Sequence, residues 1–403
     1  MKKTAQKMVS DIPYTLSIFA SFFKHPIFMT QNNSQLFILV FLGMLTAFGP
    51  FVTDMYLPTL PAMTGYFHTT SSQVQLGLTA SMIGLAVGQL FFGPLSDKYG
   101  RRPPLLAALI LFLLSTIGCL CSERIMQFVG WRLVQGIAGA GGIVISRSIA
   151  ADKYSGKELA KMLAIIGAIN GVAPVAAPIA GGSMADSTGW QGIFWTLFVL
   201  GIILLAGCLH FQESLPHTRR PHTEWKDVYI NFIKVIHNRR YMYYILQFGF
   251  GQGVLFANIA SAPFIMQEHY GFSPMMFSIC FGINAISIVI SAACAVKFPH
   301  PEQALYRGSM GMVVVSALLS MLGLTFTASN TLAMDSERTH AGMASALLGA
   351  LGFAFGGIVS PIVGLGNIMT STGIVFLVGS VCSFLCTRMA LRRTLALAQY
   401  YKK

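Results

Sequence analysis

Residues 93–103 read Gly-Pro-Leu-Ser-Asp-Lys-Tyr-Gly-Arg-Arg-Pro, and they separate two long apolar runs at 74–92 and 105–121. Each run is long enough to cross a bilayer core of about 30 Å as a helix. The short turn between them therefore predicts a tight helical hairpin. Its basic residues are expected in the cytoplasm, because cytoplasmic turns are enriched in lysine and arginine. Gly93 and Gly100 are expected to allow backbone positions that a side chain would obstruct.

The composition of the chain is that of a membrane protein. Of 403 residues, 54% are hydrophobic and only 10% are charged, which is too apolar for a soluble domain. The formal net charge is +13, but the basic residues lie in short turns without interleaved aromatic residues, so nucleic acid is not an expected partner. The seven cysteines show neither zinc spacing nor a disulfide framework, and no hydrolase or phosphate-binding motif occurs. We therefore expect no enzyme, no metal and no cofactor.

The apolar runs predict an all-α polytopic membrane protein of two six-helix halves, with eleven clear spans where twelve are expected. Lysine and arginine concentrate in alternate turns, which predicts a cytoplasmic amino terminus. The predicted organisation is a tail at 1–34, a first half at 35–211, a central cytoplasmic loop at 212–240 and a second half at 241–403. The predicted spans lie at 36–57, 74–95, 105–121, 125–149, 160–185, 192–210, 241–265, 274–296, 308–334, 341–363 and 370–388.

The ambiguous segment is 308–334, which is longer than one crossing needs and too short for two. A single crossing would place Arg338 and the basic carboxy-terminal residues outside, against the charge pattern of every earlier turn. We expect one long, tilted or broken helix here in place of two spans. The carboxyl terminus is expected to stay cytoplasmic through a re-entrant or distorted segment.

Two ionisable residues lie well inside apolar runs, Asp54 in the first and Arg132 in the fourth. A buried carboxyl costs several kcal/mol if it is ionised and unpaired, so access to water can switch its proton occupancy. Counting residues from the helix ends places both groups at comparable depth, where a direct or water-bridged pair is feasible. The alternatives are that Asp54 is wetted at the outer end of its helix and that Arg132 snorkels to the outer interface.

The fifth span carries small and kink-forming residues at spacings of three and four, which favours a seam for close helix contact. These residues are Gly167, Gly171, Pro174, Pro178, Gly181 and Gly182.

Four motifs occur in one order: Asp54-Met-Tyr-Leu-Pro58, the loop at 93–103, Arg132-x-x-Gln135-Gly136 and the seam at 167–182. Together they resemble the drug:proton antiporters of the major facilitator superfamily, and the first is similar to the Bcr/CflA (bicyclomycin/chloramphenicol) drug-resistance group. The resemblance implies twelve helices around a central cavity and proton-driven export of drug-like small molecules across a bacterial inner membrane. It implies that Asp54 binds the coupling proton and that Arg132 tunes it. It also implies that Asp97 and Arg101 latch the cytoplasmic side.

From helical faces we expect a mainly apolar cavity, and a monomer whose partners are a small-molecule substrate, protons and the bilayer. Two alternatives stay open: a transporter of a native metabolite, such as an amino acid or sugar derivative, and a transport-inactive remnant, which the shortened second half favours. The candidate substrate contacts are Tyr56, Gln135, Asn170, Phe248, Gln252, Phe256, Asn258 and Asn284. The candidate gating residues are Gly93, Asp97, Gly100, Arg101, Arg102, Gly171, Pro174, Pro178 and Gly182.

Overall fold

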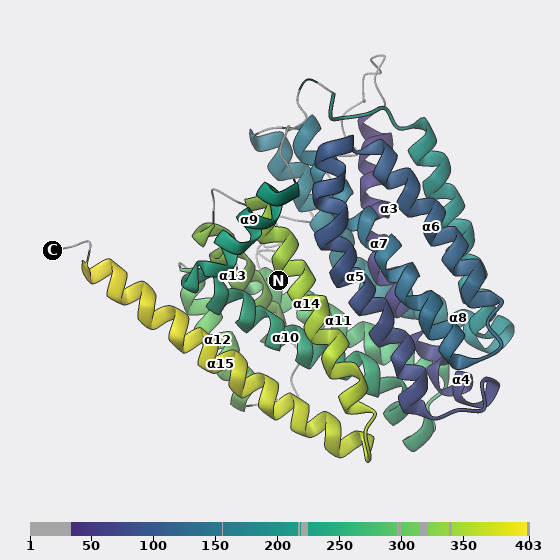
Figure 1. Ribbon diagram of the computed structural model, residues 1–403. Coiled ribbons are helices and arrows are strands. Elements are labelled where there is room, and N and C mark those ends of the chain that lie inside the picture. The colour runs from purple at the N-terminus through teal and green to yellow at the C-terminus, as the bar shows by residue number, and fades with distance from the viewer. Residues whose placement is uncertain are drawn as a thin grey trace, which may run out of the picture.

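The computed structural model describes residues 34–400 apart from 155, 217, 219–224, 296, 297, 299, 315–320 and 338–340. Every regular element in the described part of the chain is a helix (Figure 1). The first half contains α3 Gln35–Asp54, η1 Leu57–Thr59, α4 Leu60–Tyr66, α5 Ser71–Tyr99, α6 Arg102–Leu120, α7 Ile125–Lys153 and α8 Gly156–His210. The rest contains α9 Trp225–His237, α10 Arg239–Phe264, η3 Ile265–His269, α11 Pro274–Ala295, α12 Pro301–Val314, α13 Met321–Ser336, α14 Ala341–Val363 and α15 Ile368–Tyr400.

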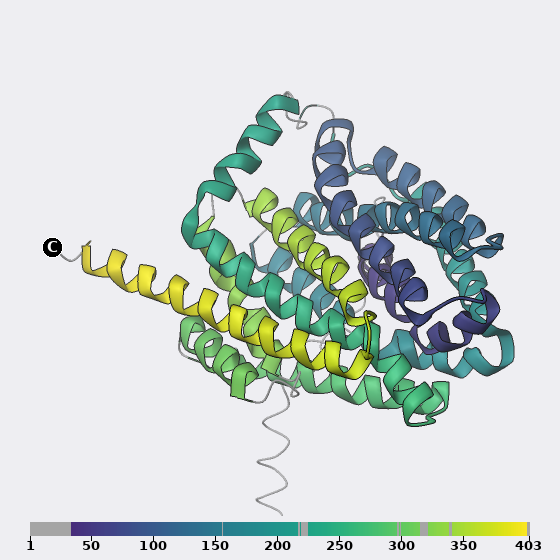
Figure 2. The same ribbon diagram turned by 60° about the horizontal axis from the view of Figure 1, so that its bottom comes forward.

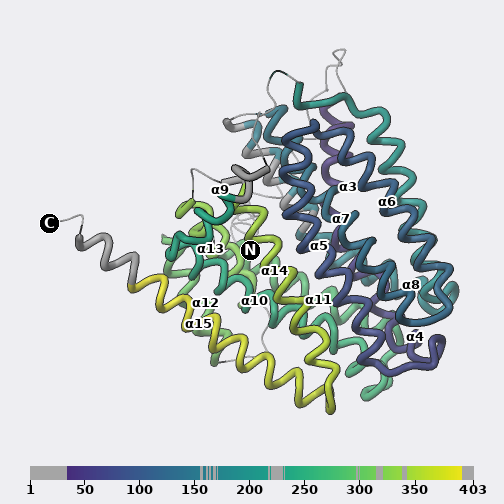
Figure 3. Tube along the Cα trace, in the orientation of Figure 1, coloured from purple at the N-terminus to yellow at the C-terminus, as the bar shows by residue number. Residues whose placement is uncertain are grey.

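The helix α5 continues past the apolar run, through Pro94, and ends at Gly100, whose φ of 92° is left-handed. Glycine takes that angle without steric cost, so the expectation for Gly100 is confirmed. For Gly93 it is wrong, because this residue is helical and a Cβ there would make only an ordinary contact with Val144. The connection to α6 is short as predicted. However, α5 packs most extensively against α7 (Figure 3), so the two helices form no tight hairpin.

The long helix α8 is broken at Gly189, whose φ is 64°. A Cβ on Gly181, before the break, would meet Met55 at the end of α3. After the break, Gly207 lies beside Phe41, near the start of α3. The first part of α8 therefore runs along α3 in one direction and the second part returns in the other, so α8 supplies two of the predicted spans. Nine helices among the described residues are long and apolar enough to cross a membrane when α8 is counted once.

The two halves meet along two pairs of helices. The helix α14 lies between α5 of the first half and α10 of the second (Figure 2). On the other side, α8 packs against α11. A large hydrophobic core fills the first half and reaches into α10 and α11, while a separate core in the second half joins α10 to α12, α13, α14 and α15. The central interface therefore consists of whole helices from both halves.

The segment 308–334 differs from the prediction. Where one long helix was expected, α12 and α13 are two short helices that lie side by side in opposite directions. Gly308 packs against Thr325, and Gly311 packs against Met321. These glycines let the two backbones approach closely, which favours two packed helices over one long one. With 14 and 16 residues, each helix is about 20–25 Å long, which is shorter than a full crossing.

The paired helices α12 and α13 begin and end at the same side of the bundle. The Asn238 side chain, which caps the start of α10, donates through Nδ2 to the Ser336 carbonyl at the end of α13, at 3.0 Å. Ala304, near the start of α12, shares a core cluster with Tyr241 in the first turn of α10. Ala390 of α15 belongs to the same cluster, so the basic residues near Arg388 lie at this end too. This path is compatible with a re-entrant segment, and the cytoplasmic carboxyl terminus stays a prediction.

The central segment at 212–240 contains a helix where a loop was expected. The helix α9 buries Phe232 and Val235 and exposes Ile230, Ile233 and Ile236. The spacing of three between the exposed isoleucines is helical, and it was the signal that could have found this element. The predicted tail at 1–34 lies outside the described residues, apart from Ser34, which caps α3.

The path of α12 and α13 makes a testable prediction for single cysteines in a cysteine-free background. His300→Cys and Asp335→Cys should be labelled by a membrane-impermeant maleimide from the same side of the membrane. Leu365→Cys, in the turn before α15, should be labelled from the opposite side. Labelling in intact cells and in inverted vesicles checks this. If positions 300 and 335 become accessible from opposite sides, one helix crosses here and the paired arrangement is wrong.

Candidate functional site

The break after Asp54 creates the first candidate site. The helix α3 ends at Asp54, and Pro58 and Pro61 lie in the first turns of η1 and α4. Proline lacks the amide hydrogen that would continue a helix, and it favours a helix start. The last carbonyl groups of α3 therefore lack the amide partners of a continuing helix. In a membrane these groups must find other donors.

Arg132 of α7 supplies that donor. Its side chain is fully buried, and Nη2 donates to the Val52 carbonyl at 3.1 Å. The guanidinium carbon lies 4.4 Å from the centre of the Tyr56 ring and 5.6 Å from that of Phe194. A cation at the carboxyl end of a helix is stabilised by the helix dipole, and aromatic faces attract it further. Full burial rules out snorkelling of Arg132 to the outer interface.

Asp54 is also buried, with 5% of its surface exposed. Thr53 Oγ1 donates to Asp54 Oδ1 at 2.7 Å. Of the direct and water-bridged pairs with Arg132 that were feasible, the direct pair does not form, since the ion pairs among the described residues all involve Arg101. Arg132 instead binds the backbone two residues before Asp54 and stacks on the side chain two residues after it. The two charged groups therefore share one segment without touching.

Gln135 orients Arg132 from the next turn of α7. Its Oε1 accepts from Arg132 Nη1, and its Nε2 donates to Thr116 Oγ1 of α6 at 2.8 Å. Thr116 in turn donates to the Phe112 carbonyl at 2.7 Å. Both sides of the amide are thus occupied by protein, and Gln135 is fully buried. In this geometry Gln135 positions Arg132, and its role as a substrate contact stays a prediction.

The other candidate substrate contacts lie in different environments. Tyr56 is fully buried beneath Arg132. On α10, Phe248 packs 5.1 Å from Phe326 and Phe256 packs 5.8 Å from Phe353, measured between ring centres. Gln252, Asn258 and Asn284 are half-buried, while the side chain of Asn170 lies outside the described part of the chain.

The loop after α5 forms a second charged cluster, centred on Arg101. Its guanidinium binds both carboxylate oxygens of Asp152 at the end of α7, at 2.7 and 3.2 Å, and also pairs with Asp97. Burial by itself would lower the pKa of Arg101. The hydrogen bonds to the two carboxylates and their negative charges raise it by more, so the pKa lies above its ordinary value. Only 14% of the Asp152 side chain is exposed, against 53% for Asp97. The stronger partner of Arg101 is therefore Asp152.

Glu213, just beyond α8, completes this cluster. Its carboxylate accepts from the backbone amides of Arg101 at 2.9 Å, Arg102 at 3.0 Å and Leu215 at 3.0 Å. The Arg102 side chain binds the carbonyls of Cys208 and Leu209 at the end of α8. The cluster thus ties α5, α6, α7 and α8 together within the first half. Sequence reasoning missed Asp152 and Glu213, although each is an acid directly after a predicted span.

The seam on α8 makes close contact with the second half. A Cβ on Gly182 would lie 2.3 Å from Ser278 Oγ and 3.0 Å from the Pro274 carbonyl of α11. Gly171 lies further along the same interface, beside Val289. Pro178 is buried and Pro174 half-buried within α8. Of the small residues predicted as a seam, Gly171 and Gly182 therefore lie where the halves approach each other, whereas Gly181 faces Met55 of the first half.

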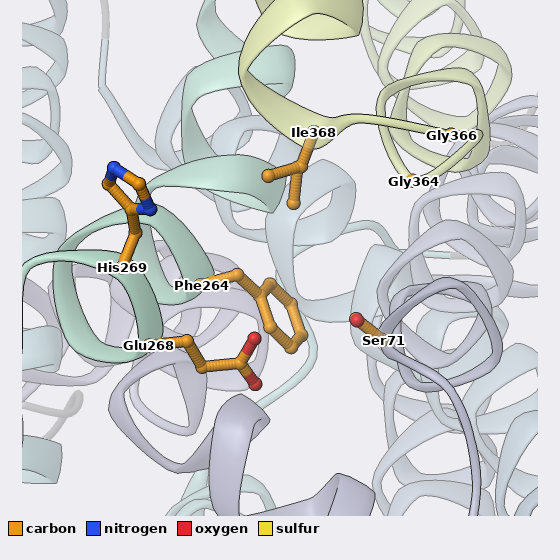
Figure 4. A pocket seen from close by; sticks show the side chains of 7 residues that line it. All are labelled: Ser71, Phe264, Glu268, His269, Gly364, Gly366 and Ile368. Atoms are coloured by element: carbon orange, nitrogen blue, oxygen red, sulfur yellow. The ribbon is translucent and has the colours of Figure 1, made fainter.

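The halves are also joined at the end opposite the basic turns. Gln75 Nε2 of α5 donates to the Ala260 carbonyl of α10 at 3.2 Å, and Gln267 Nε2 of η3 donates to the Pro58 carbonyl at 3.0 Å. Beside them lies a pocket of about 290 Å³ at the boundary of the halves. Figure 4 shows its lining side chains, which are Ser71, Phe264, Glu268, His269, Gly364, Gly366 and Ile368. This end of the interface is closed by hydrogen bonds.

These features define a class of protein: a multi-pass membrane transporter with two helical halves and a buried acid near their closed end. The chain belongs to the Major Facilitator Superfamily, whose family model matches residues 36–362.

The chain is similar to several bacterial transport proteins. It is 36% identical to an uncharacterised transporter of this superfamily, YdgK of Bacillus subtilis, over 83% of this chain and 90% of the relative. It is 27% identical to a bicyclomycin resistance protein homologue of Haemophilus influenzae, over 87% and 95%. A bacterial homologue of the human lysosomal transporter Spinster has a similar fold, with a TM-score of 0.69 and 15% identity over 89% and 99% of the two chains. The predicted fold class and drug-resistance resemblance are confirmed.

Arg132 provides a prediction about stability. Arg132→Ala should lower the free energy of unfolding by about 3 kcal/mol, because the Val52 carbonyl and the Gln135 amide lose a charged, buried partner. Arg132→Lys should lose less, since lysine keeps the charge without the planar fork. Denaturant unfolding of the purified protein in mixed micelles measures both, and equal wild-type stability in the two variants would contradict the capping role.

The Arg101 cluster predicts different roles for its two acids. Asp152→Asn should destabilise the folded protein by about 2 kcal/mol, because a buried bidentate pair is lost. Asp97→Asn should cost less than about 1 kcal/mol, since the Asp97 side chain is itself 53% exposed. The same unfolding measurement compares them, and a larger loss for Asp97→Asn would reverse the assignment.

Proposed function

We propose that the chain is a proton-coupled exporter of drug-like small organic molecules in a bacterial inner membrane, with a cytoplasmic amino terminus. The observation that carries the proposal is the buried carboxyl of Asp54 at the break in α3. It lies between Val52 and Tyr56, which bind the Arg132 guanidinium. A carboxyl that lacks a direct ionic partner gains and loses a proton according to its access to water.

Coupling requires that the same conformational change exposes both the carboxyl and the cargo. Asp54 is followed by Met55, whose backbone lies against Gly181 of α8 with no space for a Cβ between them. The next residue of α8, Gly182, packs against α11 of the other half. Separation of the halves at this end would therefore disturb the surroundings of Asp54 directly. This contact supports a link between opening and proton release.

The gate proposal rests on the antiparallel contact between α5 and α14. Ile83 lies against Gly357, and Gln89 lies against Gly349. Extension of this register carries Asp97 toward the start of α14 at Ala341. A carboxylate is favourable near a helix amino terminus, so Asp97 would stabilise one state of the cytoplasmic gate. The latch biases the equilibrium only by the difference of its free energy between the two states.

The names of the relatives support export of antibiotics. They include the bicyclomycin resistance protein homologue and a chloramphenicol resistance protein of Pseudomonas aeruginosa that is 29% identical over 66% of this chain and 63% of the relative. The basic turns at the ends of α5, α7 and α8 favour their placement in the cytoplasm. Chloramphenicol and bicyclomycin are therefore suitable first compounds for a transport assay.

Asp54→Asn should abolish export that is driven by a proton gradient. Binding of the same compound should stay within about threefold of wild type, because the amide keeps the size and an accepting oxygen. Uptake of chloramphenicol into inverted vesicles under an imposed pH gradient, with binding to the purified protein in parallel, measures both. Asp186→Asn, an exposed acid near the end of the first part of α8, is the matched control.

Three outcomes of this assay decide between the functions. Export by wild type and the control but not by Asp54→Asn supports the proposal. Export by all three removes Asp54 as the coupling site. Absence of transport by wild type for a panel of drugs and metabolites would favour the remnant.

A further inference from the structure

The interface between the halves contains a hydrophobic layer around Phe353 of α14. Phe353 packs against Leu85 of α5 and against Ala140 and Ile143 of α7. The helices α5 and α7 run in the same direction here, since Gly84 lies against Leu133 and Gly88 against Ile137 and Ala140. Both helices continue from this layer toward the basic turns.

The next layer toward the basic turns is polar. Gln89 follows Leu85 by four residues and Arg147 follows Ile143 by four, so each points in the same direction as the residue that contacts Phe353. On α14, Gly349 is one turn before Phe353, and a Cβ there would lie 2.2 Å from Gln89 Oε1. Gln89 and Arg147 therefore belong to one layer between the halves.

Two buried amides around this layer lack partners. Gln89 is only 3% exposed, and its Nε2 has no hydrogen-bond partner within the described residues. In the same part of the chain, Gln252 Oε1 of α10, whose side chain lies beside Gly352, is also buried and unpaired. A buried polar group without a partner costs about 1–3 kcal/mol. Such groups are retained where a ligand or water satisfies them.

Arg147 is the charged member of the layer. It is exposed, although its neighbours on α7 from Gly141 to Ala150 are buried or half-buried. Among the described residues no carboxylate lies within 4.0 Å of it. At this end Asp97 and Asp152 are bound to Arg101, and Glu213 accepts from backbone amides. An unpaired cation in a membrane-spanning helix is costly and marks a functional position.

We propose that Arg147 and Gln89 form a recognition point for an acidic group on the cargo, so that amphipathic organic acids are a substrate class of this transporter. The guanidinium fork binds a carboxylate through two parallel hydrogen bonds, and Gln89 Nε2 donates a third. The apolar body of the acid lies against Phe353 and Phe256. This inference rests on the proposed transport function and deepens it by naming the charge of a cargo.

The test compares three aromatic carboxylic acids of different size with their uncharged methyl esters. Arg147→Gln should weaken binding of the acids at least about tenfold, because a charge-assisted bidentate contact is lost. The esters should change less than about twofold. Arg147→Lys should retain part of the preference, and Arg388→Gln, an exposed cation on α15, should change neither. Equilibrium binding to the purified protein in nanodiscs measures affinity, and uptake into inverted vesicles measures transport.

The outcomes separate this inference from the proposed function. A loss of binding in Arg147→Gln that affects the acids and spares the esters supports the inference. If, in addition, no pH gradient drives transport, the proposed proton coupling is wrong while the inference still holds. Equal losses for acids and esters would show a structural role for Arg147 and overturn the inference. Unchanged affinities, or no acid binding by wild type, would also overturn it while chloramphenicol export could still establish the proposed function.

Discussion

The structure depends on one constraint: a carbonyl left open inside a membrane must find a donor. The break in α3 leaves the Val52 carbonyl without the amide of a continuing helix, and the Arg132 guanidinium binds it. The same bond fixes α7 against α3, and Gln135 carries the contact on to α6. The position of Asp54 follows from this arrangement, because it is the last residue of the capped helix. A cation that satisfies the backbone also places a buried acid near the boundary of the two halves.

The second charged cluster also supplies hydrogen-bond partners to backbone groups near helix ends, at the other end of the first half. Arg101 and Glu213 join the ends of α5, α6, α7 and α8 through side-chain and backbone hydrogen bonds. The contacts within the first half are therefore charged and multiply bonded. Between the halves, the contacts are made by glycines, single glutamine bonds and aromatic packing. This difference in bond strength favours rigid halves that move against each other, as alternating access requires.

The arginine in the interface between the halves differs in its partners from the arginines within the first half. Within the first half Arg101 and Arg132 bind carboxylate, carbonyl and amide oxygens, whereas Arg147 has no carboxylate within 4.0 Å among the described residues. Gln89 Nε2 adds a buried donor without a partner in the layer that the two residues are inferred to share. Arg147 and Gln89 are the polar groups that the proposed cargo would meet.

The sequence alone determined the fold class, because runs of apolar residues of membrane-spanning length leave the backbone no other structure than helix. It also distinguished Asp54 and Arg132 as candidate residues, since an ionisable residue in such a run is costly. Only the tertiary structure decided what each group binds. Arg132 caps Val52 and does not pair with Asp54, Gln135 serves Arg132, and Asp152 and Glu213 hold the Arg101 loop. The segment 308–334 became two paired helices because Gly308 and Gly311 permit close contact. Hydrophobic length is a property of one segment, whereas a hydrogen-bond partner is chosen by the packing of helices far apart in the chain.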